Sequence, residues 1–584
     1  MRTNSRLIQS LVFSLTLLPP CLVAILIFKY GVDLPQWDQW SYVKFFEKFS
    51  HGSLTLGDLF HQVNEYRQFF PNVVFVALGW LTHWDVRYEM FLTLLVACFI
   101  SLNVYRLAER TIGGTRLSRL FLFLLANLII FSPAQYENWL QGQQLVYFVP
   151  IACVTTCLLV VGSRLTITTK SVICAGLSAV STFSSANGIV CWIVVLPALF
   201  LIETSKGSRA RTRLVCGWTI GFFLSVCLYF YHYRKPGWSP SLFTAVFRPL
   251  QALTYFLGFV GAPLALERAI LAIAIGSVVI TVFGISCVYF FRGRADRALL
   301  NRMTIWLMIG AYSVLTGVLT TIGRLGFGVG QSQATRYQGY SAYLLVSLVY
   351  LITIMTRDFS SRPDSGRQAL LIRRLALLAA ALLISAQPLI FILSINRMDE
   401  MRTLLLQAKA SILFINFKPD TLLITTLYPD LDRLTREANV LDSLGFLRPK
   451  LIKTLRVQEF AAPGGSNPAA YGSWNQFTRS EDNRYVASGW AILPDRGTTP
   501  DAIILAYQTT GGETLMFHTT RPQDKPAEVW YRRRNHSTAW KVSFSTDELP
   551  PAPATLSAWG FDANTGKAFR LDGSFEIPTG AFGK

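Results

Sequence analysis

The chain has few charged residues and few cysteines. The positions of its cysteines and histidines are not those of a disulfide-rich or metal-binding soluble protein. Only 15% of its 584 residues are Asp, Glu, Lys or Arg, against about 25% in soluble domains. The six histidines are scattered, without the spacing of metal ligands. The nine cysteines lie in or beside apolar runs, and none follows Cys287. The composition therefore excludes disulfides after Cys287 and predicts that most of the chain lies in lipid.

Charged residues are also missing from the middle of the long apolar runs. Ion-coupled transporters normally need ionisable groups at that depth, so coupled transport is disfavoured, whereas a passive flippase stays open. The net charge of +20 comes mostly from short basic clusters between the apolar runs. Such clusters are typical of positive cytoplasmic loops and not of a surface that follows nucleic-acid phosphates. We therefore expect no nucleic-acid partner.

Eleven apolar runs predict eleven membrane spans, each close to the roughly 20 residues needed to cross. The run from Phe69 to Trp84 is shorter, about 16 residues, and is expected on the membrane surface or partly embedded. The basic clusters place the N-terminus in the cytoplasm and the C-terminus outside. The predicted spans are 7–28, 88–107, 118–134, 145–162, 171–184, 188–203, 214–233, 269–291, 303–323, 340–356 and 374–395.

Hydropathy falls after the last predicted span. Residues 396–463 carry helical patterns and are expected to form a connector on the outer face. The segment 464–473 is rich in Gly, Ser and Pro and is typical of a linker. Six or more short runs of period two follow, which predict a β-sandwich accessory domain over 464–584. The expected fold is thus an all-α membrane domain, residues 1–395, with an extramembrane β-sandwich after it.

The first outer loop, residues 29–87, is too long and too aromatic for a simple connector. Its length and alternating polarity predict two helices lying on a membrane surface. Asp38 is a candidate general base here, flanked by Trp37 and Trp40, which would restrict water and raise its pKa. The alternative is that Asp38 caps a helix beginning near Gln39.

Two further charged residues, Glu65 and Arg67, open the second predicted surface helix. They are candidates to orient an acceptor or to bind phosphate. The alternative, equally open, is that they pair with neighbouring groups and fix the loop.

The other outer loops are rich in Tyr, Trp, Gly and amide residues. Amides hydrogen-bond sugar hydroxyls, and flat rings stack on sugar faces, although an interfacial aromatic belt has the same composition. Two arginines beside a glycine-rich loop suit phosphate oxygens, or else extend to lipid headgroups. The candidates for phosphate or sugar binding are Arg324, Arg336 and Tyr337, together with Asn138, Gln141 and Asn187, for which helix capping is the alternative.

The residues at 37–40, 64–71 and 323–337, on a chain with this topology and an outer C-terminal domain, resemble the GT-C superfamily of membrane glycosyltransferases. The likeness covers residues 1–395. It implies a polyprenyl-phosphate sugar as donor and a glycan, lipid or protein hydroxyl as acceptor. It also implies that a first-loop carboxylate, here Asp38 with Glu65, takes the acceptor proton while arginines hold the lipid phosphate. Direct displacement would invert the anomeric centre.

The chain departs from this family at one position. GT-C members often carry adjacent Asp and Glu in the first loop, whereas Gln39 follows Asp38. Some members use a divalent cation, Mg²⁺ or Mn²⁺, and others none, so the resemblance leaves the cofactor open. It implies a bacterial inner membrane with a periplasmic C-terminal domain and contacts with membrane lipid. The alternatives are a flippase or transporter of lipid-linked saccharides and a non-catalytic anchor for a carbohydrate-binding domain.

Overall fold

The structure is a computed structural model, and the residues that it describes form two compact units. The first unit comprises Met1–Gly31, Ser53–Thr82 and Val86–Met398, and the second comprises Val32–Gly52, His83–Asp85 and Asp399–Lys584. The first outer loop is therefore divided between the two units, which its sequence pattern did not predict. The described residues are 2–202, 208–293, 295–362, 366–417, 419–463, 468–480, 484–522, 538–551 and 553–577.

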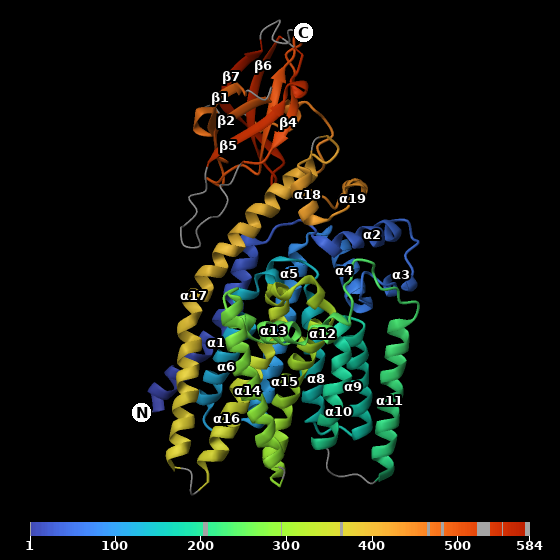
Figure 1. The fold of residues 1–584 in the computed structure, drawn as a ribbon, viewed down its shortest axis with the longest axis vertical. Helices are drawn as coiled ribbons and strands as arrows, with labels where there is room; N and C mark the ends of the chain where they lie inside the picture. Colours follow the sequence, from blue (N-terminus) through green and yellow to red (C-terminus); the bar gives the residue numbers. More distant parts are fainter. Residues whose placement is uncertain are drawn as a thin grey trace. The chain divides into compact units, whose positions relative to one another are not determined.

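Helices make up the first unit, and each of the eleven predicted spans falls on one of them (Figure 1). Within the described ranges, eight helices are long and apolar enough to cross a membrane. They are α1 (Arg2–Tyr30), α5 (Arg87–Thr111), α6 (Arg116–Ile130, extended by α7, Tyr136–Leu140), α11 (Ser208–Phe230), α14 (Ala269–Arg292), α15 (Arg297–Arg324), α16 (Gln338–Ser360) and α17 (Gly366–Leu413).

Three predicted spans coincide with helices shorter than this length, so the number eleven remains a prediction. These are α8 (Leu145–Val161), α9 (Ile167–Thr182) and α10 (Val190–Ile202). The apolar run before α5 forms the short helix α4 (Phe69–Thr82), and two helices, α12 (Thr244–Phe247) and α13 (Pro249–Gly261), lie in a stretch that was predicted as an outer loop. Helix α13 packs against α14 at glycines, because a Cβ on Gly261 would lie 2.0 Å from the Ala272 carbonyl oxygen.

The helices differ in how much of their apolar surface is covered. In α16, 72% of the most apolar stretch of 18 residues is buried, and α15 packs along this helix. In α17 only 6% of the corresponding stretch is buried, and Leu377 and Leu382 are exposed. An uncovered apolar surface of this extent suits contact with lipid. The described helices thus fit a multi-pass membrane protein.

Helix α17 is longer than the predicted span 374–395. It continues through Pro388 to Leu413 without a break. The reason is that residues 397–413 contain no Gly or Pro and are rich in strong helix formers. The predicted connector carries two further helices, α18 (Thr421–Leu427) and α19 (Leu431–Ser443), and α18 lies where the pattern suggested only a separating segment.

The C-terminal strands form a half-barrel from one seven-stranded sheet, so the predicted β-sandwich is not confirmed. The strand order is β4-β3-β6-β7-β1-β2-β5, antiparallel except between β1 and β7. Strand β7 pairs with β6 along its length and with β1 at Asp572, which joins the two halves. The strands are β1 (Gly472–Arg479), β2 (Arg484–Ala491), β3 (Ala502–Gln508), β4 (Thr514–Thr520), β5 (Ala539–Ser545), β6 (Ala554–Asp562) and β7 (Lys567–Ile577).

Alternation along these strands builds the core of the half-barrel. Strand β5 buries every second residue, among them Trp540 and Phe544. Trp474, Leu505 and Leu556 from other strands complete the same apolar cluster. Part of the predicted linker, residues 464–467, lies outside the described residues.

Candidate functional site

Glu65, one of the two candidate acids, forms an ion pair with Arg324, a candidate for binding phosphate. Glu65 lies in the turn closed by the bridge between Val63 and Tyr66, and Arg324 is the last residue of α15. The Arg324 Nη1 atom is 3.2 Å from Glu65 Oε1, and the side chains are only 16% and 14% exposed. Two predicted stretches 259 positions apart are therefore brought together.

Aromatic and hydroxyl groups surround this ion pair. Arg324 Nη2 donates to the Tyr66 hydroxyl at 2.5 Å, and the guanidinium lies over the rings of Trp238 and Phe327. The Ser239 hydroxyl donates to Glu65 Oε1 at 3.1 Å. Burial raises the pKa of Tyr66 far above its ordinary value, although Arg324 opposes this. Tyr66 is therefore a neutral phenol that accepts from Arg324.

A second acid–base pair involves Arg336 and Glu137 of the short helix α7. Glu137 Oε2 accepts from the Arg336 backbone amide and from the Thr335 hydroxyl, each at 2.9 Å. The Arg336 Nη1 atom is 3.6 Å from Glu137 Oε1, longer than usual for a charge-assisted hydrogen bond. Glu137 thus fixes the backbone of the 335–337 turn and holds the guanidinium loosely. Sequence reasoning did not single out this acid.

Five tyrosines lie around the two arginines, and we call them the tyrosine cluster. The Tyr147 ring is 5.2 Å from that of Tyr340 and 6.4 Å from that of Tyr337. Tyr255 of α13 lies within electrostatic range of both Arg324 and Arg336. The members are Tyr66, Tyr147, Tyr255, Tyr337 and Tyr340.

The predicted amides lie in the first unit, Asn138 in α7, Gln141 directly after it, and Asn187 in the 3-10 helix Ala186–Ile189. Asn138 Nδ2 donates to Gln135 Oε1 at 3.1 Å. A Cβ atom on Gly339 would lie 2.9 Å from the same Nδ2 atom. Asn187 Nδ2 donates to the Thr320 hydroxyl at 3.3 Å. Gln141 accepts from Gln144 at 2.8 Å.

Several buried polar atoms in this region have no hydrogen-bond partner among the described residues. Since buried polar groups are almost always hydrogen-bonded, such a group of atoms is typical of a place that takes up water or a polar ligand. The atoms are Asn138 Oδ1, Gln144 Oε1, Gln338 Oε1 and the Tyr255 hydroxyl.

Arg67 takes the second of the two roles that its sequence position left open. Its side chain donates to three backbone carbonyls, those of Phe60, Tyr229 and Tyr231. The residue is buried at 5% exposure. Its contacts therefore fix the loop, and they favour this role over binding phosphate.

The predicted base Asp38 belongs to the second unit, together with Trp37 and Trp40. It lies in the first turn of the 3-10 helix Trp37–Tyr42, and Gln36 is the N-cap residue, with a 3.1 Å bond from its amide to Gln39. Gln36, and not Asp38, thus occupies the N-cap position of this helix. Trp40 is fully buried, whereas Trp37 is 51% exposed and has a φ of 50°. A tryptophan in this left-handed region is strained by about 1–2 kcal/mol.

Charged residues of α19 and the segment before it complete the surroundings of Asp38. The charge of Asp38 acts on the Tyr428 hydroxyl, which also accepts from Arg433. Arg433 Nε lies 2.7 Å from Glu437 Oε1, and burial raises the pKa of Glu437. The spacing of Arg433 and Glu437 on a predicted helix was a signal for this pair, but nothing in the sequence linked them to Asp38.

No protein-family model, curated protein or solved structure matches this chain.

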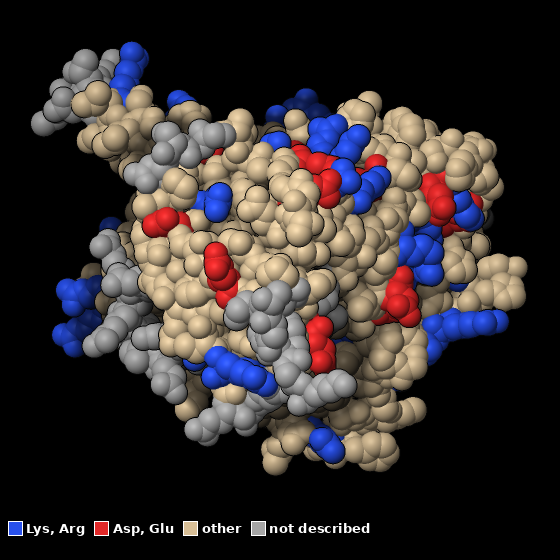
Figure 2. Space-filling view, turned by 90° about the horizontal axis from the view of Figure 1, so that it is seen from above, with Lys and Arg blue, Asp and Glu red and all other residues tan. Residues whose placement is uncertain are grey.

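On one face of the molecule, several of the charged residues lie in mixed groups. Figure 2 shows Lys and Arg beside Asp and Glu, among a majority of uncharged residues. Across the described ranges, no group of three His, Cys, Asp or Glu side chains is placed to hold a metal ion.

Proposed function

We propose that this protein is a GT-C-type glycosyltransferase that moves a sugar from a polyprenyl-phosphate donor to an acceptor hydroxyl. The observation that supports this most is the partly buried group formed by Glu65, Tyr66 and Arg324. It joins the first outer loop to the end of α15 and combines a carboxylate, a phenol and a guanidinium. Such a combination suits a substrate with a sugar and a phosphate.

The two arginines are proposed to hold the donor phosphate. A guanidinium has five N–H donors in a planar fork that matches phosphate oxygens. Glu65 would position the guanidinium of Arg324, and Glu137 the backbone of the turn that carries Arg336, before the donor arrives. The low polarity around Trp238 and Phe327 would strengthen the attraction between arginine and phosphate.

The sugar is proposed to lie against the tyrosine cluster. Aromatic rings offer flat apolar faces. The oxygens of Asn138, Gln144 and Gln338, which have no partner among the described residues, would accept hydrogen bonds from sugar hydroxyls.

Asp38 is proposed as the general base, with Glu65 as the second carboxylate. The acceptor oxygen bonds to the anomeric carbon while its proton passes to the carboxylate. The bond from the anomeric carbon to the phosphate oxygen breaks, and its electron pair leaves with the lipid phosphate. The leaving group is already a stable anion, so no general acid is needed, and the configuration inverts.

The topology that accompanies this proposal has eleven spans. The N-terminus would lie in the cytoplasm of a bacterium and the half-barrel in the periplasm, beyond the inner membrane. The acceptor would be a glycan, a glycolipid or a protein hydroxyl.

The test is sugar release from a panel of polyprenyl-phosphate sugars in proteoliposomes. We expect turnover by the wild type and a loss of about 10²–10⁴-fold in Asp38→Asn, the usual contribution of a general base. Donor binding should survive, because Asn keeps the shape of the side chain. Asp33→Asn is the matched control and should keep its turnover. Absence of turnover with every donor, or full turnover in Asp38→Asn, would contradict the proposal.

A further inference from the structure

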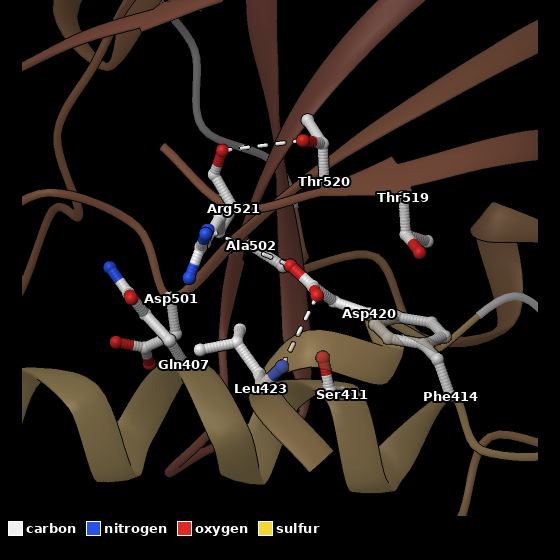
Figure 3. Close-up of a pocket in the computed structure, with 10 residues that line it drawn as sticks. All are labelled: Gln407, Ser411, Phe414, Asp420, Leu423, Asp501, Ala502, Thr519, Thr520 and Arg521. Atoms are coloured by element: carbon white, nitrogen blue, oxygen red, sulfur yellow. Dashed lines mark hydrogen bonds and ion pairs between the residues drawn. The ribbon is translucent and has the colours of Figure 1, made fainter. Parts of the chain in front are cut away.

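A small polar pocket lies within the second unit, and none of its lining residues is among those assigned above to sugar transfer. One wall comes from the last turns of α17, a second from the beginning of α18, and a third from β3 and the edge strand β4 (Figure 3). Its lining residues are Gln407, Ser411, Phe414, Asp420, Leu423, Asp501, Ala502, Thr519, Thr520 and Arg521.

Polar groups of several kinds line this pocket. They include a carboxamide, three hydroxyls, carboxylates and one guanidinium, next to the ring of Phe414. Figure 3 shows the Asp420 carboxylate turned toward Arg521 and the Gln407 side chain rising from α17. The pocket therefore offers hydrogen-bond donors and acceptors side by side.

Its central acid–base pair is loose. The Arg521 Nε atom is 3.7 Å from Asp420 Oδ2, and the two side chains are 39% and 24% exposed. This exceeds the roughly 2.7–2.9 Å of a charge-assisted hydrogen bond. Asp420 is oriented independently, since its Oδ1 atom accepts from the Leu423 amide at 3.3 Å. A ligand hydroxyl between the two groups would donate to the carboxylate and accept from the guanidinium.

The charge balance selects among ligand classes. Arg521 offsets Asp420, and the carboxylate of Asp501 is 2.6 Å from Arg496. An anion such as phosphate would be repelled by the two carboxylates, and a cation would be repelled by Arg521. A neutral ligand with hydroxyl groups encounters neither repulsion.

The size of the pocket limits how such a ligand enters. The pocket opens to solvent. Its volume is about 10 Å³, the space of one water molecule or one hydroxyl group. We infer that this pocket is a second saccharide site, which takes one hydroxyl of a neutral sugar between Asp420 and Arg521 while the ring lies at the mouth. The site would bind glycan independently of the transfer reaction.

The test is a titration of the full-length protein in nanodiscs, followed by saturation-transfer NMR. The probes are the methyl glycosides of glucose, mannose and galactose. We expect saturable binding of at least one, and binding about tenfold weaker in Asp420→Asn and in Arg521→Gln, the effect of losing a hydrogen bond to a charged group. Asn at position 420 still accepts from the Leu423 amide, so the fold should be kept.

The matched control is Glu513→Gln, which breaks the exposed pair between Arg456 and Glu513 (3.1 Å) in the same unit. Binding should be unchanged in this variant. Absence of saturable binding, equal binding in the Asp420 variant, equal weakening in the control, or competition by inorganic phosphate would each overturn the inference. The readout is binding and not turnover, so its failure is distinguishable from failure of the transferase proposal.

Discussion

Each unit contains a group of buried charged residues, and the two groups differ in the residues that surround their ion pairs. In the half-barrel, Arg496 lies 2.6 Å from Asp501 and 3.2 Å from Asp562. Asp501 also accepts from the Ala563 amide and Asp562 from the Asn564 amide. Backbone bonds within the domain thus hold both carboxylates, as expected of a group that maintains the fold.

The charges of the helical unit have different partners. Arg324 and Glu65 come from distant parts of the chain and lie among rings, hydroxyls and buried oxygens without partners in the described residues. Such a group can exchange its partners for a ligand. The two groups are thus alike in burial and differ in the neighbours of their ion pairs.

The largest expected effect is on the stability of the half-barrel. Arg496→Gln leaves two buried carboxylates without their cation, which typically costs about 3–5 kcal/mol in free energy of unfolding. We expect hydrogen exchange to speed up in β3 and β6 of the full-length protein, while sugar transfer per folded molecule is unchanged. Unchanged exchange would show that the pair is not structural.

The next effect is on activity. Arg324→Gln should lower sugar transfer about 100-fold, the order of loss found when one group that stabilises transition-state charge is removed. Arg324→Lys keeps the charge without the fork and should restore part of the rate. Arg362→Gln, which alters an exposed pair with Asp358, is the control. If Arg324→Gln unfolds the helical unit instead, the comparison between the two groups fails.

The smallest effect is a pH dependence. Loss of solvation raises the pKa of Asp501 from 3.8 to about 6, against the opposing effect of Arg496. Between pH 4 and 6 the folded state therefore binds more protons than the unfolded state. The free energy of unfolding should then fall as the pH rises through this window, by about 2 kcal/mol. Hydrogen exchange of β3 across this range checks the prediction, and Asp501→Asn should remove the dependence.

Hydropathy and periodicity were sufficient to predict the long helices and most strands. Each predicted span falls on a helix, and the period-two runs became the strands of the C-terminal domain. The half-barrel was not predicted because its closure depends on the pairing of β7 with β1 at Asp572. That contact joins strands far apart in the sequence, and no local pattern encodes it. The continuation of α17 was missed because falling hydropathy was interpreted as the end of the helix.

The candidate site was likewise predicted only in part. Residue chemistry and loop composition singled out Glu65, Arg324 and Arg336, but not their partners. Glu137 and Tyr147 were missed because a single acid or tyrosine beside an apolar run carries no distinguishing signal. Their roles depend on which helices pack together, and this is decided by contacts between distant segments.

The most direct test follows a donor labelled in both sugar and lipid, added to one face of proteoliposomes that contain this protein and an acceptor glycan. The account predicts that the bond between sugar and phosphate is broken, so that polyprenyl phosphate is released and labelled sugar appears on the acceptor. An intact labelled donor in the opposite leaflet, without release of polyprenyl phosphate, would contradict the account and would identify a flippase.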